Sequence, residues 1–324
     1  MPTVCVPRTG ASRLPRHLFF LFIWLTLLPS AHAQVAGQSI NMVTGTQWPG
    51  GDPFLERQNE PSMAVSSRNP LHVLAGNNDY RTVDLPGVPG NKPTGDAWLG
   101  LFSSFDGGST WQSVLVPGYP QDTSARGSGS PLKPYEAGAD PMVRAGTNGL
   151  FYYSGLAFNR ESNGTSAVFV ARYIDDNNFQ GANTIRYLDA TIVATGDANH
   201  FLDKPAIAVD IPRPGSPTCT IPAGPSVPAA TISAGRIYIA YTQFNGPESA
   251  NQSAIMFSES GDCGKTWSTP QKISGSQQTN QGAALAIDPS TGNLYVTWRI
   301  FASKISLTHW PASPTSTGQT PSPR

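Results

Sequence analysis

The sequence Ser104-Phe-Asp106-Gly-Gly108-Ser-Thr110-Trp111 returns later in the chain as Ser260-Gly-Asp262-Cys-Gly264-Lys-Thr266-Trp267. Both stretches match the pattern Ser-x-Asp-x-Gly-x-Thr-Trp at every fixed position. From average residue usage, a single match should arise by chance in on the order of 10⁻⁴ chains of this length. The residue types suit a tight hairpin, because a short carboxylate accepts backbone N–H bonds, glycine adopts a positive φ, and an indole packs between sheets. We therefore interpret each stretch as a structural turn within a repeated unit.

Four short, mostly apolar segments recur along the chain and are interpreted as the buried first strand of that unit. They are Pro61–Val65, Pro141–Ala145, Pro205–Val209 and Ala283–Ile287. Turn residues and a second strand follow each segment, at His72–Gly76, Leu150–Ala157, Arg236–Tyr241 and Asn293–Trp298. Third strands follow in three units, at Ala97–Ser103, Ser166–Tyr173 and Ser253–Ser258. The repetition predicts an all-β fold, a β-propeller of four-stranded antiparallel blades with about three and a half blades.

The composition agrees with short strands joined by tight turns, since the chain has 32 glycines and 30 prolines and only 13% charged residues. Three arginines precede an apolar run at residues 18–28 and the site Ala31-His32-Ala33, which is the pattern of a signal peptide over residues 1–33. We therefore expect a secreted protein. Residues 34–301 are expected to form the propeller region, and residues 302–324, which are rich in Ser, Thr and Pro, a disordered tail.

Charge and hydropathy exclude two classes of partner. Removal of residues 1–33 takes away three arginines and no carboxylates, so 21 basic and 21 acidic residues become 18 and 21. Such a chain lacks the basic surface that nucleic-acid binding requires, and no later apolar run is long enough to span a membrane. The oligomeric state cannot be read from the sequence.

Two cysteines, Cys219 and Cys263, remain after the signal peptide. In an oxidising compartment we expect them to form one disulfide, and the alternative is two separate buried thiols. Two cysteines without a neighbouring histidine do not indicate a metal site. Asp175 and Asp176 could bind calcium, but they lack the spaced acids and glycine of a calcium loop, so an ordinary turn is the favoured interpretation. No organic cofactor is expected.

Propellers bind ligands near the central axis, beside the innermost strands, so the residue pairs before the four apolar segments are the candidate site. We call them the mouth pairs: Asn59-Glu60, Ala139-Asp140, Asp203-Lys204 and Gln281-Gly282. Gathered carboxylates of Glu60, Asp140 and Asp203 could serve as acid and base in glycoside hydrolysis, with Lys204 contacting substrate, or they could bind a cation. The alternative is that these side chains cap strand ends and face water.

The two opening motifs resemble the Asp-box, or BNR, repeats of sialidases and related propellers. The resemblance implies a six-bladed fold that this chain covers in part, and turns that are structural and lie at the blade periphery. The family's first blade opens with Arg-Ile-Pro, where this chain has Asn59-Glu60-Pro61. Asp79, Asp84 and Asp96 all lie where the family's loop acid would fall, and Asp79 is favoured because it directly follows a strand. Asn59 stands where the family has the first arginine of the triad that binds the sialic-acid carboxylate, and Arg81 could replace that arginine. The resemblance implies an exo-sialidase or other glycoside hydrolase, or a remnant of one, with a glycan or glycoconjugate as partner. The alternative is a non-catalytic exported propeller that binds glycans or proteins.

Overall fold

The computed structural model describes residues 39–43, 58–81, 96–160, 164–177, 185–225, 227–246, 252–275, 279–301 and 305–310. All the strands lie in one compact unit, Ile40–Arg324. The expected signal peptide and the last fourteen residues of the expected tail lie outside the described residues. Within the described ranges, no helix is both long and apolar enough to cross a membrane.

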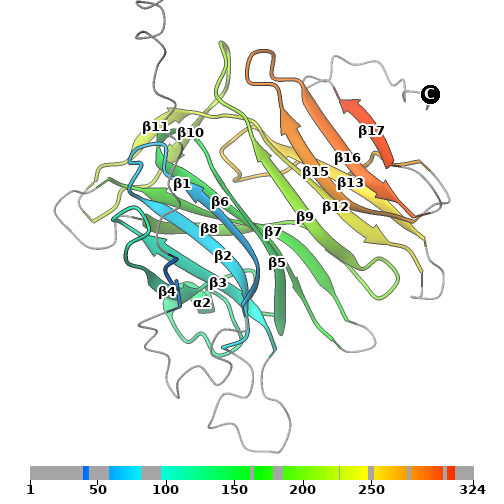
Figure 1. Ribbon diagram of the computed structural model, residues 1–324, viewed down its shortest axis with the longest axis horizontal. Helices are drawn as coiled ribbons and strands as arrows, with labels where there is room; N and C mark the ends of the chain where they lie inside the picture. Colours follow the sequence, from blue (N-terminus) through cyan, green and yellow to red (C-terminus); the bar gives the residue numbers. More distant parts are fainter. Residues whose placement is uncertain are drawn as a thin grey trace, which may run out of the picture. The chain divides into compact units, whose positions relative to one another are not determined.

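The fold is all-β and consists of successive antiparallel sheets, which are the blades of a β-propeller (Figure 1). Blade 1 contains β1 (Asn59–Val65), β2 (Val73–Asp79), β3 (Trp98–Ser104) and β4 (Gln112–Leu115). Blade 2 contains β5 (Ala137–Ala145), β6 (Leu150–Phe158), β7 (Ser166–Asp175) and β8 (Ile185–Gly196). Blade 3 contains β9 (Leu202–Val209), β12 (Ile237–Phe244), β13 (Ser253–Ser260) and β14 (Gln271–Lys272), and blade 4 contains β15 (Asn280–Ile287), β16 (Leu294–Ile300) and β17 (Ile305–Trp310).

Three short elements lie in the connections between the strands. A single helical turn, α2 (Ala125–Ser128), follows blade 1, and a 3₁₀ turn, η1 (Thr147–Gly149), joins β5 to β6. The hairpin β10 (Thr218–Ile221) and β11 (Ala230–Ser233) lies between the first two strands of blade 3. The innermost strands contact one another in chain order, β1 with β5, β5 with β9 and β9 with β15, so successive blades pack side by side.

The predicted first, second and third strands are confirmed, with two differences. The expectation that every first strand is buried is wrong for β15, where alternate residues are exposed, and for β1, where Met63 is 57% and Val65 49% exposed. These two residues lie on the face of β1 that points away from blade 2, since Ser62, between Pro61 and Met63, accepts a hydrogen bond from the Val143 N–H of blade 2. In addition, β17 lies inside the stretch expected to be a disordered tail, where the sequence Ile-Ser-Leu-Thr-His-Trp has the period-two alternation of a strand.

The core fills the spaces between blades, and this explains why the central strands have long apolar runs. In β6 and β7 nearly every residue is buried, because each of these strands is covered on both faces. Between blades 1 and 2, the Tyr153 ring lies against Gly76, where a Cβ would come within 2.4 Å of the ring atom Cε2. The Tyr153 hydroxyl donates a hydrogen bond of 2.8 Å to the carbonyl oxygen of Gly100.

The two Ser-x-Asp-x-Gly-x-Thr-Trp stretches form equivalent turns after β3 and β13. In the first, Asp106 accepts hydrogen bonds from the backbone N–H and the hydroxyl of Thr110, at 2.9 and 2.6 Å. These bonds, the side-chain one foremost, lower the pKa of Asp106 to about 2. Asp262 accepts the same pair of bonds from Thr266 at 2.9 and 2.6 Å. The carboxylates thus stabilise the turns, while their identification as Asp-boxes stays a prediction from the sequence.

The glycines of both turns and the tryptophan of the second turn take the expected positions. Gly108 and Gly264 have φ of 93° and 80°, the region that a side chain disfavours. The backbone N–H of each donates to the serine that begins its motif, Ser104 or Ser260. Trp111 donates to the Gly108 carbonyl oxygen, and Trp267 packs against the core between blades 2 and 3.

The expected disulfide is confirmed. Cys219 of β10 bonds to Cys263, which stands inside the second turn and has φ of 60°. The bond therefore attaches the β10–β11 hairpin to the turn that follows β13. Two separate buried thiols are excluded.

The Asp175 carboxylate, considered above as a calcium ligand, is fully buried and accepts hydrogen bonds from within the protein. Ser66 Oγ donates to Oδ2, and His72 Nδ1 lies 2.9 Å from the same oxygen. The backbone N–H of Asn177 donates to Oδ1 at 2.8 Å. These contacts join the β1–β2 turn of blade 1 to the end of β7 in blade 2, so Asp175 has a structural role.

Candidate functional site

The backbone repeats one irregularity at the start of every innermost strand. The pairing of the first two strands shifts register at the mouth pair of each of the four blades, which is the signature of a β-bulge. The second residue of each pair has a left-handed backbone, with φ of 52° at Glu60, 57° at Asp140, 47° at Lys204 and 69° at Gly282. Non-glycine residues rarely adopt this conformation, and it costs about 1–3 kcal/mol for each. Backbone strain of this kind gathers at functional sites.

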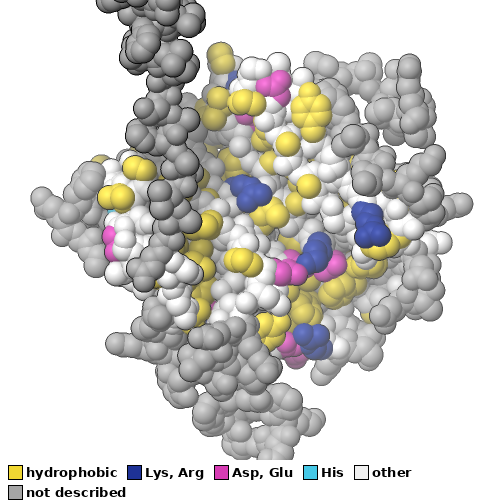
Figure 2. Space-filling view, in the orientation of Figure 1, with side chains coloured by type: hydrophobic (Ala, Val, Ile, Leu, Met, Phe, Trp, Pro, Cys, Tyr) yellow, Lys and Arg dark blue, Asp and Glu magenta, His cyan; other side chains and the backbone are white. Residues whose placement is uncertain are grey.

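The bulges bring charged side chains of three blades together. Lys204 Nζ lies 2.7 Å from Glu60 Oε1 and 3.1 Å from Asp140 Oδ1. The Lys204 backbone N–H also donates to Asp140 Oδ2 at 3.2 Å. On the face shown in Figure 2, basic and acidic side chains adjoin near the centre, surrounded by surface that is mostly uncharged. The structure therefore joins Glu60, Asp140 and Lys204 in one cluster.

Asp203 is the partly buried carboxyl of the blade 3 mouth pair. Burial raises its pKa above the ordinary value, and the charge of Glu60 raises it further. A hydrogen bond with the Asp140 side chain and the charge of Lys204 oppose this shift without cancelling it. Asp203 consequently keeps its proton to a higher pH than an exposed aspartate does.

Lys204 stays charged because its carboxylate partners raise its pKa. Partial burial acts to lower its pKa, but the hydrogen bonds to Glu60 and Asp140 and the charges of both carboxylates outweigh burial and raise it. Lys204 is half exposed, and so is Glu60, whereas the Asp140 side chain is 12% exposed. The site thus combines a shielded acid, two carboxylates and one ammonium group.

Two residues that sequence reasoning missed support this site. The Asn78 side-chain oxygen accepts a hydrogen bond of 2.8 Å from the Asp140 backbone N–H and so connects blade 1 to the mouth pair of blade 2. Thr242 stands opposite Asp203 in the strand register and is fully buried. Its hydroxyl has no hydrogen-bond partner in the described part of the chain. The only sequence signal was their position at the ends of second strands.

Asp79 and Arg81, predicted as catalytic acid and substrate-binding residue, do not join the cluster. Both side chains are fully buried, and Arg81 Nη2 lies 2.7 Å from Asp79 Oδ2. Arg81 also donates to the Ser113 hydroxyl and the Val114 carbonyl oxygen of β4. A carboxylate paired in this way inside the protein is not accessible to substrate, so we correct both assignments to a structural role.

Two further mouth residues belong to blades 1 and 4. Asn59 is exposed and pairs with Asn78 in the register of β1 and β2. At Gly282, a Cβ would meet no atom within 4 Å, so blade 4 leaves its mouth position open. In the described ranges no group of three or more His, Cys, Asp or Glu side chains is arranged to hold a metal ion.

The structure has similarities to glycan-processing proteins at low sequence identity. No protein-family model matches the sequence, and no curated protein is similar to it in sequence. A sialidase from Trypanosoma rangeli in complex with the inhibitor DANA is 14% identical over 79% of this chain and 36% of its own, with a TM-score of 0.45. The leech intramolecular trans-sialidase is 12% identical, and the match covers 85% of this chain and 51% of the leech protein, with a TM-score of 0.45. An α-L-arabinofuranosidase from Fusarium graminearum is 14% identical, and the match covers 79% of this chain and 63% of the fungal protein, with a TM-score of 0.43.

This chain therefore spans between about a third and two thirds of these proteins. The function has to be argued from the chemistry of the mouth pairs.

Proposed function

We propose that this chain is a secreted, glycan-directed propeller protein that hydrolyses a glycosidic bond at the mouth pairs. The observation that carries the proposal is the different environment of two neighbouring carboxyls, Asp203 and Asp140. Asp203 is shielded and has a raised pKa, whereas Asp140 is bonded to an ammonium group. Pairs of carboxyls that differ in this way divide the acid and base roles of glycoside hydrolysis.

In this mechanism Asp203 donates its proton to the oxygen of the leaving group, which breaks the bond to the anomeric carbon. Asp140 or Glu60, each bonded to Lys204, stabilises the positive charge that develops on the sugar ring or activates water. Lys204 positions both carboxylates. An exo-sialidase is the specific activity implied by the sequence motifs, and a fluorogenic sialoside is therefore the first substrate to test.

Asp203→Asn is expected to lower kcat/KM about 100-fold, because an amide cannot donate the proton that the leaving group needs. The measurement is release of 4-methylumbelliferone from a panel of sialosides, arabinofuranosides and hexosaminides. Glu136→Gln is the matched control, since Glu136 is an exposed carboxylate just before β5, and it should retain full activity. A wild-type chain that cleaves none of these substrates would refute the hydrolase.

The pH profile provides a test with a defined sign. Activity should fall as pH rises through the raised pKa of Asp203, because the acid is then deprotonated. Lys204→Met should move this basic limb to higher pH, since the Lys204 charge lowers the pKa of Asp203. Glu60→Gln should move it to lower pH, since the Glu60 charge raises that pKa. If the basic limbs of both variants moved in the same direction, this result would contradict the assignment of Asp203 as the general acid.

A non-catalytic glycan-binding protein is the second candidate. The observation that favours it is the engagement of Lys204 with Glu60 and Asp140, which leaves these carboxylates bonded within the protein. Arg81 is also buried and offers no guanidinium to a sugar carboxylate. Glycan-array binding in the absence of turnover would support this candidate.

A further inference from the structure

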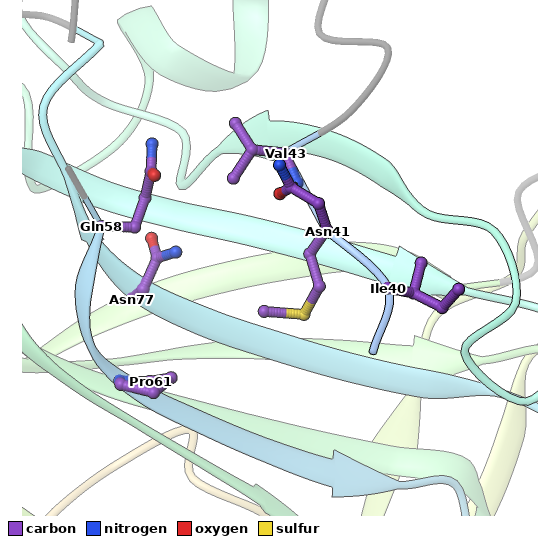
Figure 3. Close-up of a pocket in the computed structure, with 7 residues that line it drawn as sticks. Ile40, Asn41, Val43, Gln58, Pro61 and Asn77 are labelled. Carbon is purple, nitrogen blue, oxygen red and sulfur yellow. The ribbon is translucent and has the colours of Figure 1, made fainter. Parts of the chain in front are cut away.

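A pocket of about 370 Å³ adjoins the mouth pair of blade 1 (Figure 3). Its volume lies within the range of small-molecule sites, about 300–1,000 Å³. Gln58, Pro61 and Asn77 line one side, and the segment Ile40–Val43 lines the other. Pro61 directly follows Glu60, so the pocket begins where the mouth pair ends.

One buried hydrogen-bond acceptor in this pocket has no donor. Asn77 of β2 is 2% exposed, and its side-chain oxygen has no hydrogen-bond partner in the described part of the chain. Its register partner on β3 is Gly100, and a Cβ there would lie 2.3 Å from this oxygen. The glycine thus makes room for the amide, which in Figure 3 extends from β2 toward Gln58. Buried acceptors are normally paired, so a donor is expected from outside the chain.

The lining defines the chemistry of that donor. Asn77, Gln58 and Asn41 contribute side-chain amides, and the other lining residues are apolar: Ile40, Met42, Val43 and Pro61. None of the lining residues that the structure describes carries a charge. Such a surface suits an uncharged molecule with hydroxyl donors on one edge and C–H groups on a face, and its described residues offer no opposite charge to a carboxylate or an ammonium group.

We propose that this pocket binds a neutral saccharide unit, with a sugar hydroxyl donating to the Asn77 side-chain oxygen. The identification of the ligand as a sugar rests on the proposed function, whereas the requirement for an uncharged hydroxyl donor rests on the pocket alone. Because Pro61 joins the pocket to the mouth pair, the bound unit belongs to the same glycan whose neighbouring unit lies at Glu60. The pocket therefore selects glycans with a neutral residue beside the one that is cleaved.

The test is binding of lactose, the neutral probe, and of N-acetylneuraminic acid, the anionic probe, by titration calorimetry and saturation-transfer NMR. Lactose should bind, and N-acetylneuraminic acid should bind at least tenfold more weakly at this pocket. Asn77→Leu should weaken lactose binding at least tenfold, because it removes the acceptor and keeps the side-chain size. Asn199→Leu, at an exposed turn outside the pocket, should bind lactose as the wild type does.

Stability separates a binding role of Asn77 from a structural one. Without ligand, Asn77→Leu should raise Tm, since it replaces a buried unpaired amide with an apolar group of the same size. If that variant does not fold, Val43→Trp fills the pocket from the opposite side and should also abolish lactose binding. The proposal is overturned if wild-type protein does not bind lactose, or if Asn77→Leu, or Val43→Trp where Asn77→Leu does not fold, binds it unchanged.

The two proposals fail separately. Asp203→Asn should lose turnover and still bind lactose, because Asp203 does not line the pocket. Turnover without lactose binding would overturn the pocket alone, and lactose binding without turnover on any glycoside would overturn the hydrolase alone.

Discussion

Asp79→Ala is expected to lower the free energy of unfolding by about 3–5 kcal/mol, as removal of one member of a buried ion pair does. The substitution leaves the Arg81 guanidinium fully buried at the end of β2 without its carboxylate. Arg81 would keep its bonds to Ser113 and Val114, but these partners are uncharged and cannot balance the guanidinium. The measurement is urea unfolding followed by tryptophan fluorescence.

A half-exposed ion pair is the matched control for this effect. Arg236, directly before β12, lies 2.9 Å from Glu259 of β13, with side chains 41% and 23% exposed. Glu259→Ala should cost about 1 kcal/mol or less, because exposed pairs are screened by water. The double variant Asp79→Leu with Arg81→Met should recover much of the stability lost in Asp79→Ala. An Asp79→Ala protein as stable as the Glu259→Ala control would contradict the structural role of Asp79.

Replacement of both Cys219 and Cys263 by serine is expected to lower the free energy of unfolding by about 4 kcal/mol. The disulfide spans 44 positions of the sequence, and a loop of this length gains considerable freedom in the unfolded state when the bond is removed. In the folded state, the β10–β11 hairpin would lose its covalent attachment to the turn after β13. Thermal unfolding of the variant should match that of wild-type protein in reducing agent.

Thiol titration is the independent check on the same bond. Unreduced chain lacking residues 1–33 should show no reactive thiol in denaturant, and two after reduction. Two reactive thiols before reduction would show that the bond does not form in the purified protein. Unchanged stability of the serine variant would instead show that the hairpin is held by other contacts.

The blades could be predicted from the sequence because their signals are local. The segments beginning at Pro141 and Pro205 each carry the apolar residues of an inner strand, and the turn chemistry of Asp106 and Asp262 is complete within eight residues. β17 was missed because a short alternating strand within a stretch rich in Ser, Thr and Pro resembles an irregular tail. The exposure of β1 was missed because it depends on what lies beside a blade, which its own sequence does not contain.

The candidate site could be predicted only in part. The mouth pairs were identified as a set, because each precedes an inner strand, but their common left-handed backbone was not foreseen. Asp79 was assigned a catalytic role because it follows a strand, and this was wrong because burial and pairing with Arg81 depend on contacts with β4. No feature of the sequence predicts that the side-chain oxygen of Asn77 is unpaired.

Turns and strand alternation are properties of neighbouring residues, so the all-β repeat follows from local chemistry alone. The disulfide was predicted from the count of two cysteines, although it joins residues 44 positions apart. The ion pair between Lys204 and Glu60 joins residues that are 144 positions apart. Only the packing of blades 1, 2 and 3 decides that they meet, and the same packing decides which carboxyls are shielded from water. Strand formation is governed by short-range sterics and hydrogen bonding, whereas the properties of a site depend on distance and burial in three dimensions.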